Sequence, residues 1–192
     1  RPRIFVTKMR GLKTPPLRMT SLNALVRLIV AGSAAEFFIM QQIDFQGKKV
    51  AFYISGEGGG TPLVLLHGFC EDSRIWDEWL KLLPNQPTIR IDLPGSGNSD
   101  LPENLTIESM AEAVKTVLEK LQVEKCTLTG HSMGGYVSLA FAEKWAEMLA
   151  GFCLFHSHPF ADSEEKKAGR LKSIEFIKQN GHEAYVQQLI PG

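Results

Sequence analysis

Residues 127–135, Thr-Leu-Thr-Gly-His-Ser-Met-Gly-Gly, decide the fold that we predict for this chain. A β-type run from Lys125 to Thr129 leads into Gly-His-Ser-Met-Gly, and a helical pattern begins at once. A serine at the tip of so tight a turn has strained backbone angles, so the residues two before and two after it must be small. Gly130 and Gly134 occupy those positions. Gly-x-Ser-x-Gly between a strand and a helix predicts that Ser132 exposes its hydroxyl as a nucleophile.

The motif alone is weak evidence, because Gly-x-Ser-x-Gly should occur by chance in roughly one chain of this length in twenty. Its position between a predicted strand and a predicted helix makes it strong. The helix would direct its free N–H groups and the positive end of its dipole at the serine, which favours a developing oxyanion. We therefore prefer a reactive serine to a structural Gly/Ser turn.

The composition is that of an ordinary globular protein, with 192 residues of which 44% are hydrophobic, enough for one domain with a core. Residues 1–39 carry seven Lys or Arg and one acidic residue, whereas residues 40–192 have a net charge of −6. No basic face indicates a nucleic-acid partner. Arg27 and Glu36 interrupt the apolar residues 22–40, so no membrane span is predicted.

The three cysteines, Cys70, Cys126 and Cys153, form no Cys-x-x-Cys pair and no disulfide framework, which favours a reducing, cytoplasmic location. Cys126 and Cys153 fall in predicted buried strands, where a thiol is usually a small hydrophobic group. Residues 19–35 weakly resemble a signal peptide, but a cation lies inside the apolar part. We expect residues 1–39 to be a poorly structured or foreign N-terminal extension. An amphipathic surface helix and a targeting signal are the alternatives.

Strands and helices alternate through the middle of the chain. Residues 41–45 and 48–55 flank Gln46-Gly47, a hairpin signal. Continuous apolar runs at 62–67, 88–93 and 149–155 predict strands buried on both faces. Helical spacing predicts helices after His67-Gly68-Phe69, after Thr106 as an N-cap, and after Ser132. The alternation predicts an α/β fold, a mostly parallel sheet with helices on both faces.

After Phe155 the pattern becomes helical and charged. Ser163-Glu164-Glu165 opens an amphipathic helix to about Asn180, Gly181 ends it, and a short helix covers residues 183–190. Their apolar side chains would face a pocket or the core, so the pair fits a lid over a site. We expect an N-terminal extension at 1–39, a core at 40–157 and the start of a helical cap at 158–192.

From about residue 41 to residue 192 the chain resembles the α/β-hydrolase fold, specifically the single-domain hydrolases with a helical cap after the sixth strand. Three motifs carry the resemblance in the family's order and spacing: His67-Gly68-Phe69, residues 92–99 (Asp-Leu-Pro-Gly-Ser-Gly-Asn-Ser) and residues 130–135. The resemblance implies that Ser132 is the nucleophile and that the backbone N–H groups of Phe69 and Met133 form the oxyanion hole.

The resemblance also implies roles for other residues. Trp76 and His131 would belong to the substrate pocket, although core packing is the alternative for Trp76 and His131 points away from the attack site in the usual geometry. His67 would support its loop rather than act as a base. Asp92 would tie neighbouring loops together, next to a tight turn at Gly95 and Gly97.

We predict no cofactor and no metal. His156, His158 and Asp162 have a spacing like that of metal ligands, but nothing completes a set of three or four. The ordinary interpretation of this segment is a loop at the entrance of the cap.

The chain departs from the family in one respect. The family's chain order is Ser, then Asp or Glu, then His, with the last two after later strands. We expect both to lie beyond Gly192, because the chain stops inside the cap. Asp162, a natural helix cap, and His182, between two helices, are weaker alternatives for the acid and the base. The chain is therefore expected to be a fragment of a longer serine hydrolase, weak or inactive for want of a base.

The resemblance implies a serine hydrolase that acts on carboxylic esters or related acyl substrates through an acyl-enzyme, with a small ester-like molecule as its partner. Serine at this position argues against haloalkane dehalogenase and epoxide hydrolase chemistry, which use Asp there in this fold. C–C bond hydrolysis, lactonase and acyltransferase or perhydrolase activity stay open. The alternative is a non-catalytic binder of a small apolar ligand on the same scaffold. The sequence predicts neither the substrate nor the oligomeric state.

Overall fold

The structure is a computed structural model that describes residues 5–6, 39–56, 58–83 and 85–189. The chain divides into two compact units, Arg1–His158 and Pro159–Gly192. The expected N-terminal extension, residues 1–39, lies outside the described residues except for Phe5–Val6 and Ile39, which are strand residues.

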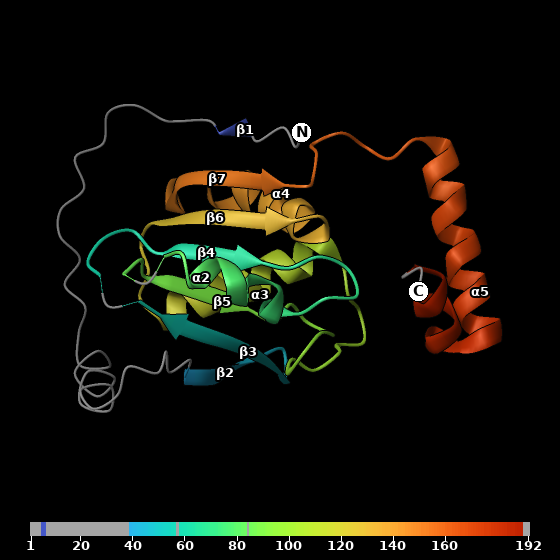
Figure 1. Cartoon of the computed structure of the whole chain (residues 1–192), viewed down its shortest axis with the longest axis horizontal. Coiled ribbons are helices and arrows are strands. Elements are labelled where there is room, and N and C mark those ends of the chain that lie inside the picture. Colours follow the sequence, from blue (N-terminus) through green and yellow to red (C-terminus); the bar gives the residue numbers. More distant parts are fainter. Residues whose placement is uncertain (1–4, 7–38, 57, 84, 190–192) are drawn as a thin grey trace. The chain divides into compact units, whose positions relative to one another are not determined.

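The first unit is built on one sheet of seven strands, with the order β1-β7-β6-β4-β5-β3-β2 (Figure 1). Its strands in chain order are β1 (Phe5–Val6), β2 (Ile39–Phe45), β3 (Lys48–Ser55), β4 (Leu63–Leu66), β5 (Thr88–Ile91), β6 (Cys126–His131) and β7 (Leu149–Phe155). The four central strands β5, β4, β6 and β7 are parallel. The remaining strands pair antiparallel, so the sheet is mixed with a parallel centre.

The hairpin predicted at Gln46-Gly47 joins β2 to β3. Both turn residues have positive φ, 55° at Gln46 and 74° at Gly47, as a two-residue hairpin turn with the twist of a β-ribbon requires. The turn is closed by Asp44, whose carboxylate accepts a hydrogen bond from the Gly47 N–H at 3.1 Å.

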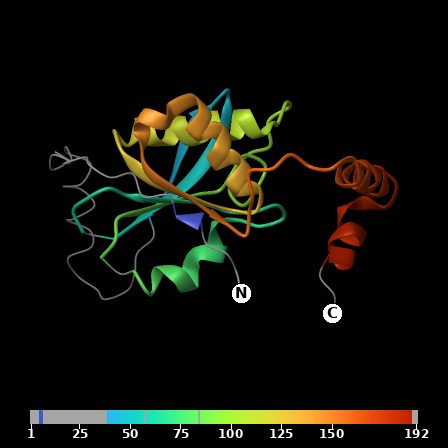
Figure 2. The same ribbon diagram turned by 90° about the horizontal axis from the view of Figure 1, so that it is seen from above.

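Helices cover both faces of the sheet (Figure 2), as the alternating pattern predicted. One face carries α3 (Ile107–Lys120) and α4 (Met133–Trp145), which pack on each other. The other face carries the short helices η1 (Ser73–Trp76) and α2 (Asp77–Leu80). A 3-10 turn, η2 (Ala146–Met148), leads from α4 into β7. The predicted N-cap of α3 is confirmed, since Thr106 and Ser109 form a reciprocal capping box.

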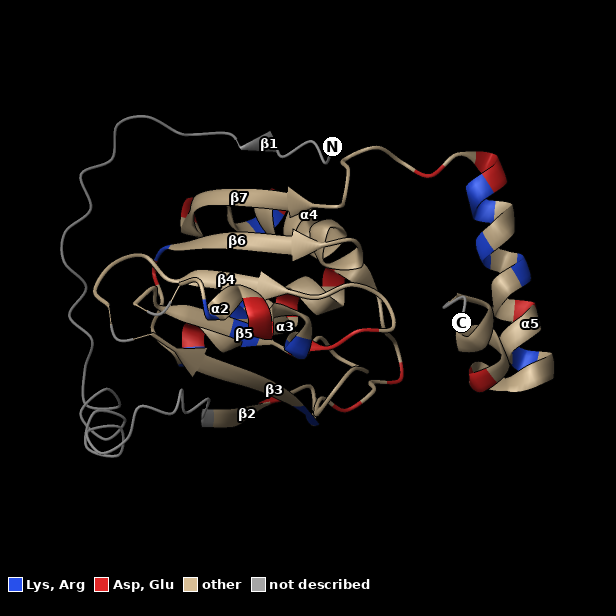
Figure 3. Cartoon of the chain, viewed as in Figure 1, with Lys and Arg blue, Asp and Glu red and all other residues tan. Residues whose placement is uncertain are grey.

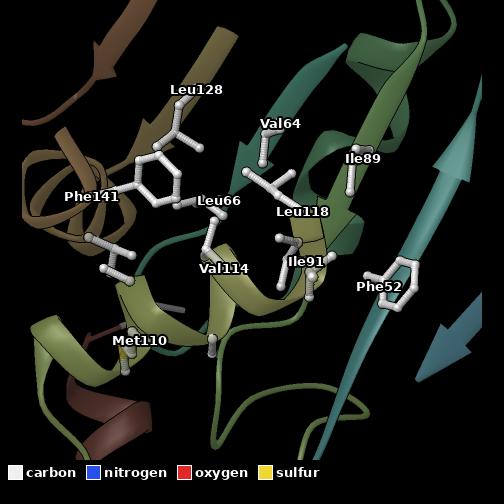
Figure 4. Packing of buried hydrophobic residues seen from close by; sticks show 14 of the residues in the cluster. Phe52, Val64, Leu66, Ile89, Ile91, Met110, Val114, Leu118, Leu128 and Phe141 are labelled. Carbon is white, nitrogen blue, oxygen red and sulfur yellow. The ribbon is translucent and has the colours of Figure 1, made fainter. Parts of the chain in front are cut away.

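The main core lies between the sheet and the layer of α3 and α4 (Figure 4). Its fully buried side chains come from β3, the parallel strands and the two helices, among them Phe52, Val64, Leu66, Ile91, Val114, Leu118, Leu128 and Phe141. Cys126 is buried there as predicted, and burial raises the pKa of its thiol to about 12. Cys153 in β7 is only half-buried.

The second unit contains α5 (Glu164–Leu189), in which Gly181 has the non-helical angles φ 82° and ψ 165°. The break confirms the prediction that Gly181 ends one helix before another begins. The expectation that the apolar side chains of α5 face a pocket or the core stays a prediction. Among the described residues none of them is buried, and Leu171 is 64% exposed.

In the ranges that the structure describes, no helix combines the length and the hydropathy needed to cross a membrane. Charged side chains of both signs are spread along α5, whereas the central strands carry few (Figure 3).

Candidate active site

The nucleophile elbow, residues 130–135, connects β6 to α4 at the carboxyl edge of the parallel strands. Ser132 has φ 49° and ψ −110°, angles that a residue with a side chain rarely adopts. Strain of this kind at a strand-to-helix turn lifts a side chain clear of the sheet. Ser132 is partly exposed, and among the described residues its hydroxyl has no hydrogen-bond partner.

The glycines of the elbow are required because no side chain would fit. A Cβ added to Gly130 would lie 2.1 Å from the carbonyl oxygen of Gly134. A Cβ on Gly134 would lie 2.6 Å from the carbonyl oxygen of His67 at the end of β4. At Gly135 it would meet the Ser157 hydroxyl at 2.2 Å. The sequence argument for small residues at Gly130 and Gly134 therefore has a direct steric cause.

The backbone of Ser132 is fixed from the neighbouring strand. Its N–H donates to the carbonyl oxygen of Phe155 at 3.0 Å. Its own carbonyl oxygen accepts from the Ser157 hydroxyl at 2.8 Å and from the Gly135 N–H at 3.0 Å. Ser157 was missed as a support of the elbow, because nothing in the local pattern shows which loop residue faces the turn.

The oxyanion loop, residues 67–72, follows β4 and lies beside the elbow. β4 pairs in parallel with β6, with Leu66 opposite Gly130 in the register, so the two strands end at the same edge. The Phe69 N–H has no hydrogen-bond partner among the described residues. Met133 is the first residue of α4, where a backbone N–H has no acceptor within the helix. These are the two donors that the sequence assigns to an oxyanion hole, and their role stays a prediction.

His67 is fully buried and holds the oxyanion loop in place. Its Nε2 accepts from the Leu93 N–H at 2.9 Å, so its Nδ1 carries the proton and donates to the Gly68 carbonyl oxygen at 2.8 Å. Burial lowers the pKa of His67, and the bond to Gly68 opposes that shift only in part. A neutral imidazole with both nitrogens engaged acts as a support, which is the role expected for His67.

Glu71 links the loop to the elbow and was missed in the sequence. Its Oε2 accepts from the Gly68 N–H at 2.7 Å and from His131 Nδ1 at 2.8 Å. The first bond has a local signal, since a carboxylate three residues on commonly reaches back to a backbone N–H. The second joins residues 60 positions apart and has none. Cys70 is exposed in this loop, but partial desolvation and the charge of Glu71 raise the pKa of its thiol, so it is not an activated nucleophile.

Asp92 ties together the loops behind the site, as predicted. It is buried, and its carboxylate accepts from the Ser73 N–H at 2.9 Å, the Asn98 N–H at 2.9 Å and the Tyr53 hydroxyl at 3.1 Å. Gly97 must be glycine, because an added Cβ would lie 2.3 Å from the Asp92 carboxylate. These bonds join β3, the start of η1 and the loop after β5.

Two residues predicted for the substrate pocket lie near the elbow in different ways. Trp76 is 3% exposed and packs with Leu65 and Leu80, which is the core-packing alternative. His131 is partly exposed, and its ring lies 5.7 Å from that of Phe155 and 6.0 Å from that of His156. Phe69 is more accessible, with 56% of its surface exposed. The pocket roles of Trp76 and His131 stay predictions.

The segment with a metal-like spacing forms other contacts. The His158 ring packs edge-on against Tyr136, and Asp162 pairs with the Arg170 Nε at 2.6 Å. Within the described ranges no group of three or more His, Cys, Asp or Glu side chains is placed to hold a metal ion. Asp162 is not the cap of α5. Ser163 precedes the helix, and its hydroxyl accepts from the Lys166 N–H at 3.3 Å, so the capping role expected for Asp162 is wrong.

The weaker candidates for a triad base and acid, His182 and Asp162, both belong to the second unit, and their catalytic roles stay predictions. His182 is exposed on α5 just after the break at Gly181. The Asp162 carboxylate is engaged by Arg170. Within the described residues of the first unit, no histidine forms a hydrogen bond with the Ser132 hydroxyl.

Comparison with known proteins identifies the arrangement. A family model described as alpha/beta hydrolase fold matches residues 61–180, from β4 to α5. Among solved structures, a thermophilic esterase from Thermogutta terrifontis is 32% identical with a TM-score of 0.69, and the match covers 82% of this chain and 58% of the esterase.

Two relatives carry other activities in their names. The 2-succinyl-6-hydroxy-2,4-cyclohexadiene-1-carboxylate synthase of Enterobacter sp. (strain 638) is 30% identical over 119 residues, 62% of this chain and 46% of that protein. Epoxide hydrolase 4 of Mus musculus is 29% identical over 128 residues, 64% of this chain and 36% of that protein. The chain spans only 32% to 54% of the length of the first curated relatives that it matches.

Proposed function

Because the chain belongs to the α/β-hydrolase fold family, we propose that it is a serine hydrolase that acts on carboxylic esters or related acyl substrates through an acyl-enzyme at Ser132. One observation carries the proposal: Ser132 stands on strained backbone, φ 49° and ψ −110°, with a hydroxyl that the described residues do not engage. A merely structural serine at a helix start would use its hydroxyl as a cap. Ser132 makes no such bond.

The chemistry follows from the parts of the site. The Ser132 oxygen attacks the acyl carbon, and the carbonyl oxygen becomes an oxyanion that accepts from the N–H groups of Phe69 and Met133. Collapse of this intermediate breaks the ester bond, the alcohol leaves with a proton, and water then releases the acid and restores the hydroxyl. Two backbone donors of this kind each contribute a few kcal/mol to stabilising the intermediate.

The proton of Ser132 needs a base, and no described residue of the first unit forms a hydrogen bond with its hydroxyl. We place the acid and the base of the triad in the part of the hydrolase fold that the relatives have and this chain does not span. The 192-residue chain by itself should then acylate slowly and turn over poorly.

An ester substrate is favoured over an epoxide by the nucleophile. Epoxide opening in this fold proceeds through a carboxylate nucleophile, and position 132 is a serine. The similarity to a mouse epoxide hydrolase therefore supports the shared scaffold. The similarity to an esterase at 32% identity supports the acyl chemistry.

Activity-based labelling tests the proposal. A fluorophosphonate probe is applied to the 192-residue chain and to the product of the complete coding sequence, each beside its Ser132→Ala variant. We expect one covalent adduct per molecule, on Ser132, formed faster in the complete product. A panel of p-nitrophenyl esters then ranks acyl lengths. If the complete product carries no adduct at Ser132, the serine hydrolase proposal fails and the non-catalytic binder takes its place.

A further inference from the structure

One carboxylate oxygen joins the two halves of the proposed active site. Glu71 Oε2 lies 2.7 Å from the Gly68 nitrogen in the oxyanion loop and 2.8 Å from His131 Nδ1 in the nucleophile elbow. Both groups point a hydrogen at the same oxygen, so Glu71 is an acceptor for each. The Glu71 and His131 side chains are 29% and 22% exposed, which shields the pair only partly from water.

The three groups are in close contact. A Cβ added to Gly68 would lie 2.6 Å from the Glu71 Oε2 and 3.0 Å from His131 Nδ1. Because Gly68 has no side chain, the Glu71 carboxylate can reach the Gly68 N–H. A side chain at position 68 would push the oxyanion loop away from the elbow.

These bonds fix the direction of the Phe69 N–H. The peptide group between Gly68 and Phe69 is planar and trans, so its carbonyl and its N–H point in opposite directions. Its carbonyl oxygen is held by His67 Nδ1 at 2.8 Å, and the preceding N–H is held by Glu71. Gly68 is thus restrained on both sides, although glycine is the most flexible residue. The Gly68 N–H is also occupied, whereas the Phe69 N–H has no acceptor among the described residues, so it stays available as a donor.

The elbow is restrained by the same oxygen. His131 immediately precedes Ser132, so its bond to Glu71 ties the turn that carries the nucleophile to the loop that carries a proposed oxyanion donor. Two preorganised donors stabilise an oxyanion only if their spacing is held to within a fraction of an ångström.

We propose that Glu71 is a positioning residue, which sets the spacing between the Phe69 and Ser132 backbones by accepting hydrogen bonds from Gly68 and His131. The inference rests on the proposed function, because it assigns Glu71 a part in acylation at Ser132. Glu71 and His131 also resemble the acid and imidazole of a triad. However, the Ser132 hydroxyl is not a partner of His131, so the pair acts through geometry.

Three variants of the 192-residue chain test the assignment. Glu71→Leu removes the acceptor, whereas Glu71→Gln keeps an oxygen that can accept from both donors. Glu78→Gln is the matched control, an exposed glutamate on α2 that pairs with Lys81 on the surface. The measurement is the second-order rate of fluorophosphonate labelling at Ser132. We expect Glu71→Leu to slow labelling at least about tenfold. Glu71→Gln should recover most of the rate, and Glu78→Gln should stay within about twofold of the wild type.

The outcomes separate the two proposals. If the wild type is labelled no more than Ser132→Ala, and the complete product is not labelled either, the serine hydrolase proposal fails. If the wild type is labelled and Glu71→Leu is labelled equally fast with unchanged circular dichroism, the positioning role is overturned.

A spectroscopic readout covers the case in which Glu71→Leu does not fold. Nitrogen-15 NMR of the wild-type histidines should show His131 protonated on Nδ1, with the signal of a hydrogen-bonded N–H. Glu71→Gln should keep that signal. A His131 ring protonated only on Nε2 in the wild type would overturn the proposal without any variant.

Discussion

The two units of the chain stabilise their helices in different ways. In the first unit, α4 places Val137 and Phe141 in the core against strands that lie far away in the sequence. In the second, every described side chain of α5 is at least partly exposed. Two of its ion pairs are local, Glu164 with Lys167 and Glu175 with Lys178, each three residues apart. Isolated pairs of this kind contribute about 0.2–0.5 kcal/mol, whereas a buried aromatic ring contributes several.

The comparison teaches where a substitution should matter. Tertiary packing sets the conformation of the first unit down to single atoms, as the glycines of the elbow show. In α5 every described side chain is at least partly exposed, so a substitution that keeps helix propensity should change the stability of that unit little. The predictions that follow pair a residue of the first unit with one of α5 where the chain offers both.

The largest expected effect is the loss of a core ring. Phe141→Ala should lower the free energy of unfolding of the first unit by about 3–5 kcal/mol, because Phe141 is fully buried and leaves a cavity. Leu171→Ala in α5 should cost less than about 1 kcal/mol, because Leu171 is 64% exposed. Urea unfolding followed by tryptophan fluorescence measures Phe141→Ala, since Trp76, Trp79 and Trp145 all belong to the first unit. Urea unfolding followed by circular dichroism at 222 nm, to which α5 contributes, measures Leu171→Ala. Similar costs for the two variants would contradict the comparison.

The next prediction is that a glycine-to-alanine substitution destabilises the first unit and stabilises the second. Gly130→Ala should destabilise the first unit by about 1–3 kcal/mol, because the new Cβ meets the Gly134 carbonyl oxygen at 2.1 Å. Gly169→Ala should stabilise α5 by about 0.5–1 kcal/mol, because nothing lies within 4 Å and alanine loses less backbone entropy in a helix. Thermal unfolding followed by circular dichroism at 222 nm should show the opposite shifts. A stable Gly130→Ala protein that labels normally would show that the elbow is not tightly packed.

The smallest effect is a pH dependence that arises in the first unit. Burial holds the pKa of His67 in the folded chain below its ordinary value of 6.5. At a pH between the folded pKa and the unfolded pKa, the unfolded chain therefore binds more protons than the folded one. The free energy of unfolding should therefore fall as the pH drops below about 6.5, by at most about 1.4 kcal/mol per pH unit from this group. His67→Gln should lack that component. Urea unfolding of both proteins between pH 7.5 and 5.5 measures the difference, and parallel curves would contradict it.

The order of elements and the elbow could be predicted because their signals are local. Apolar runs, helical spacing, the cap at Thr106 and the glycines around Ser132 each depend on neighbouring residues, and the structure agrees with them. The strand order of the sheet could not be derived from the residues themselves, since the pairing of β4 with β6 depends on packing across more than sixty positions. Resemblance to a family supplied the expected architecture.

Within the site, the residues that act through distant contacts escaped prediction. Glu71 and Ser157 both bind backbone or side-chain groups of the elbow, but many carboxylates and hydroxyls along the chain have equally suitable surroundings in sequence. Asp162 is a case in which a local signal predicted the wrong role. Its position before α5 suggested a cap, yet a guanidinium eight residues on competes for the carboxylate, and Ser163 takes the capping position.

The bracing of Ser132 from β7 has a mechanical consequence. Its N–H is held by Phe155 and its carbonyl by Ser157, so the strained turn cannot relax without moving the end of the adjacent strand. A covalent adduct that shifts the backbone of Ser132 should first displace residues 155–157, which are hydrogen-bonded to it. At these residues the polypeptide leaves the sheet on its way to α5. Hydrogen exchange of their backbone amides should therefore change when the nucleophile has reacted.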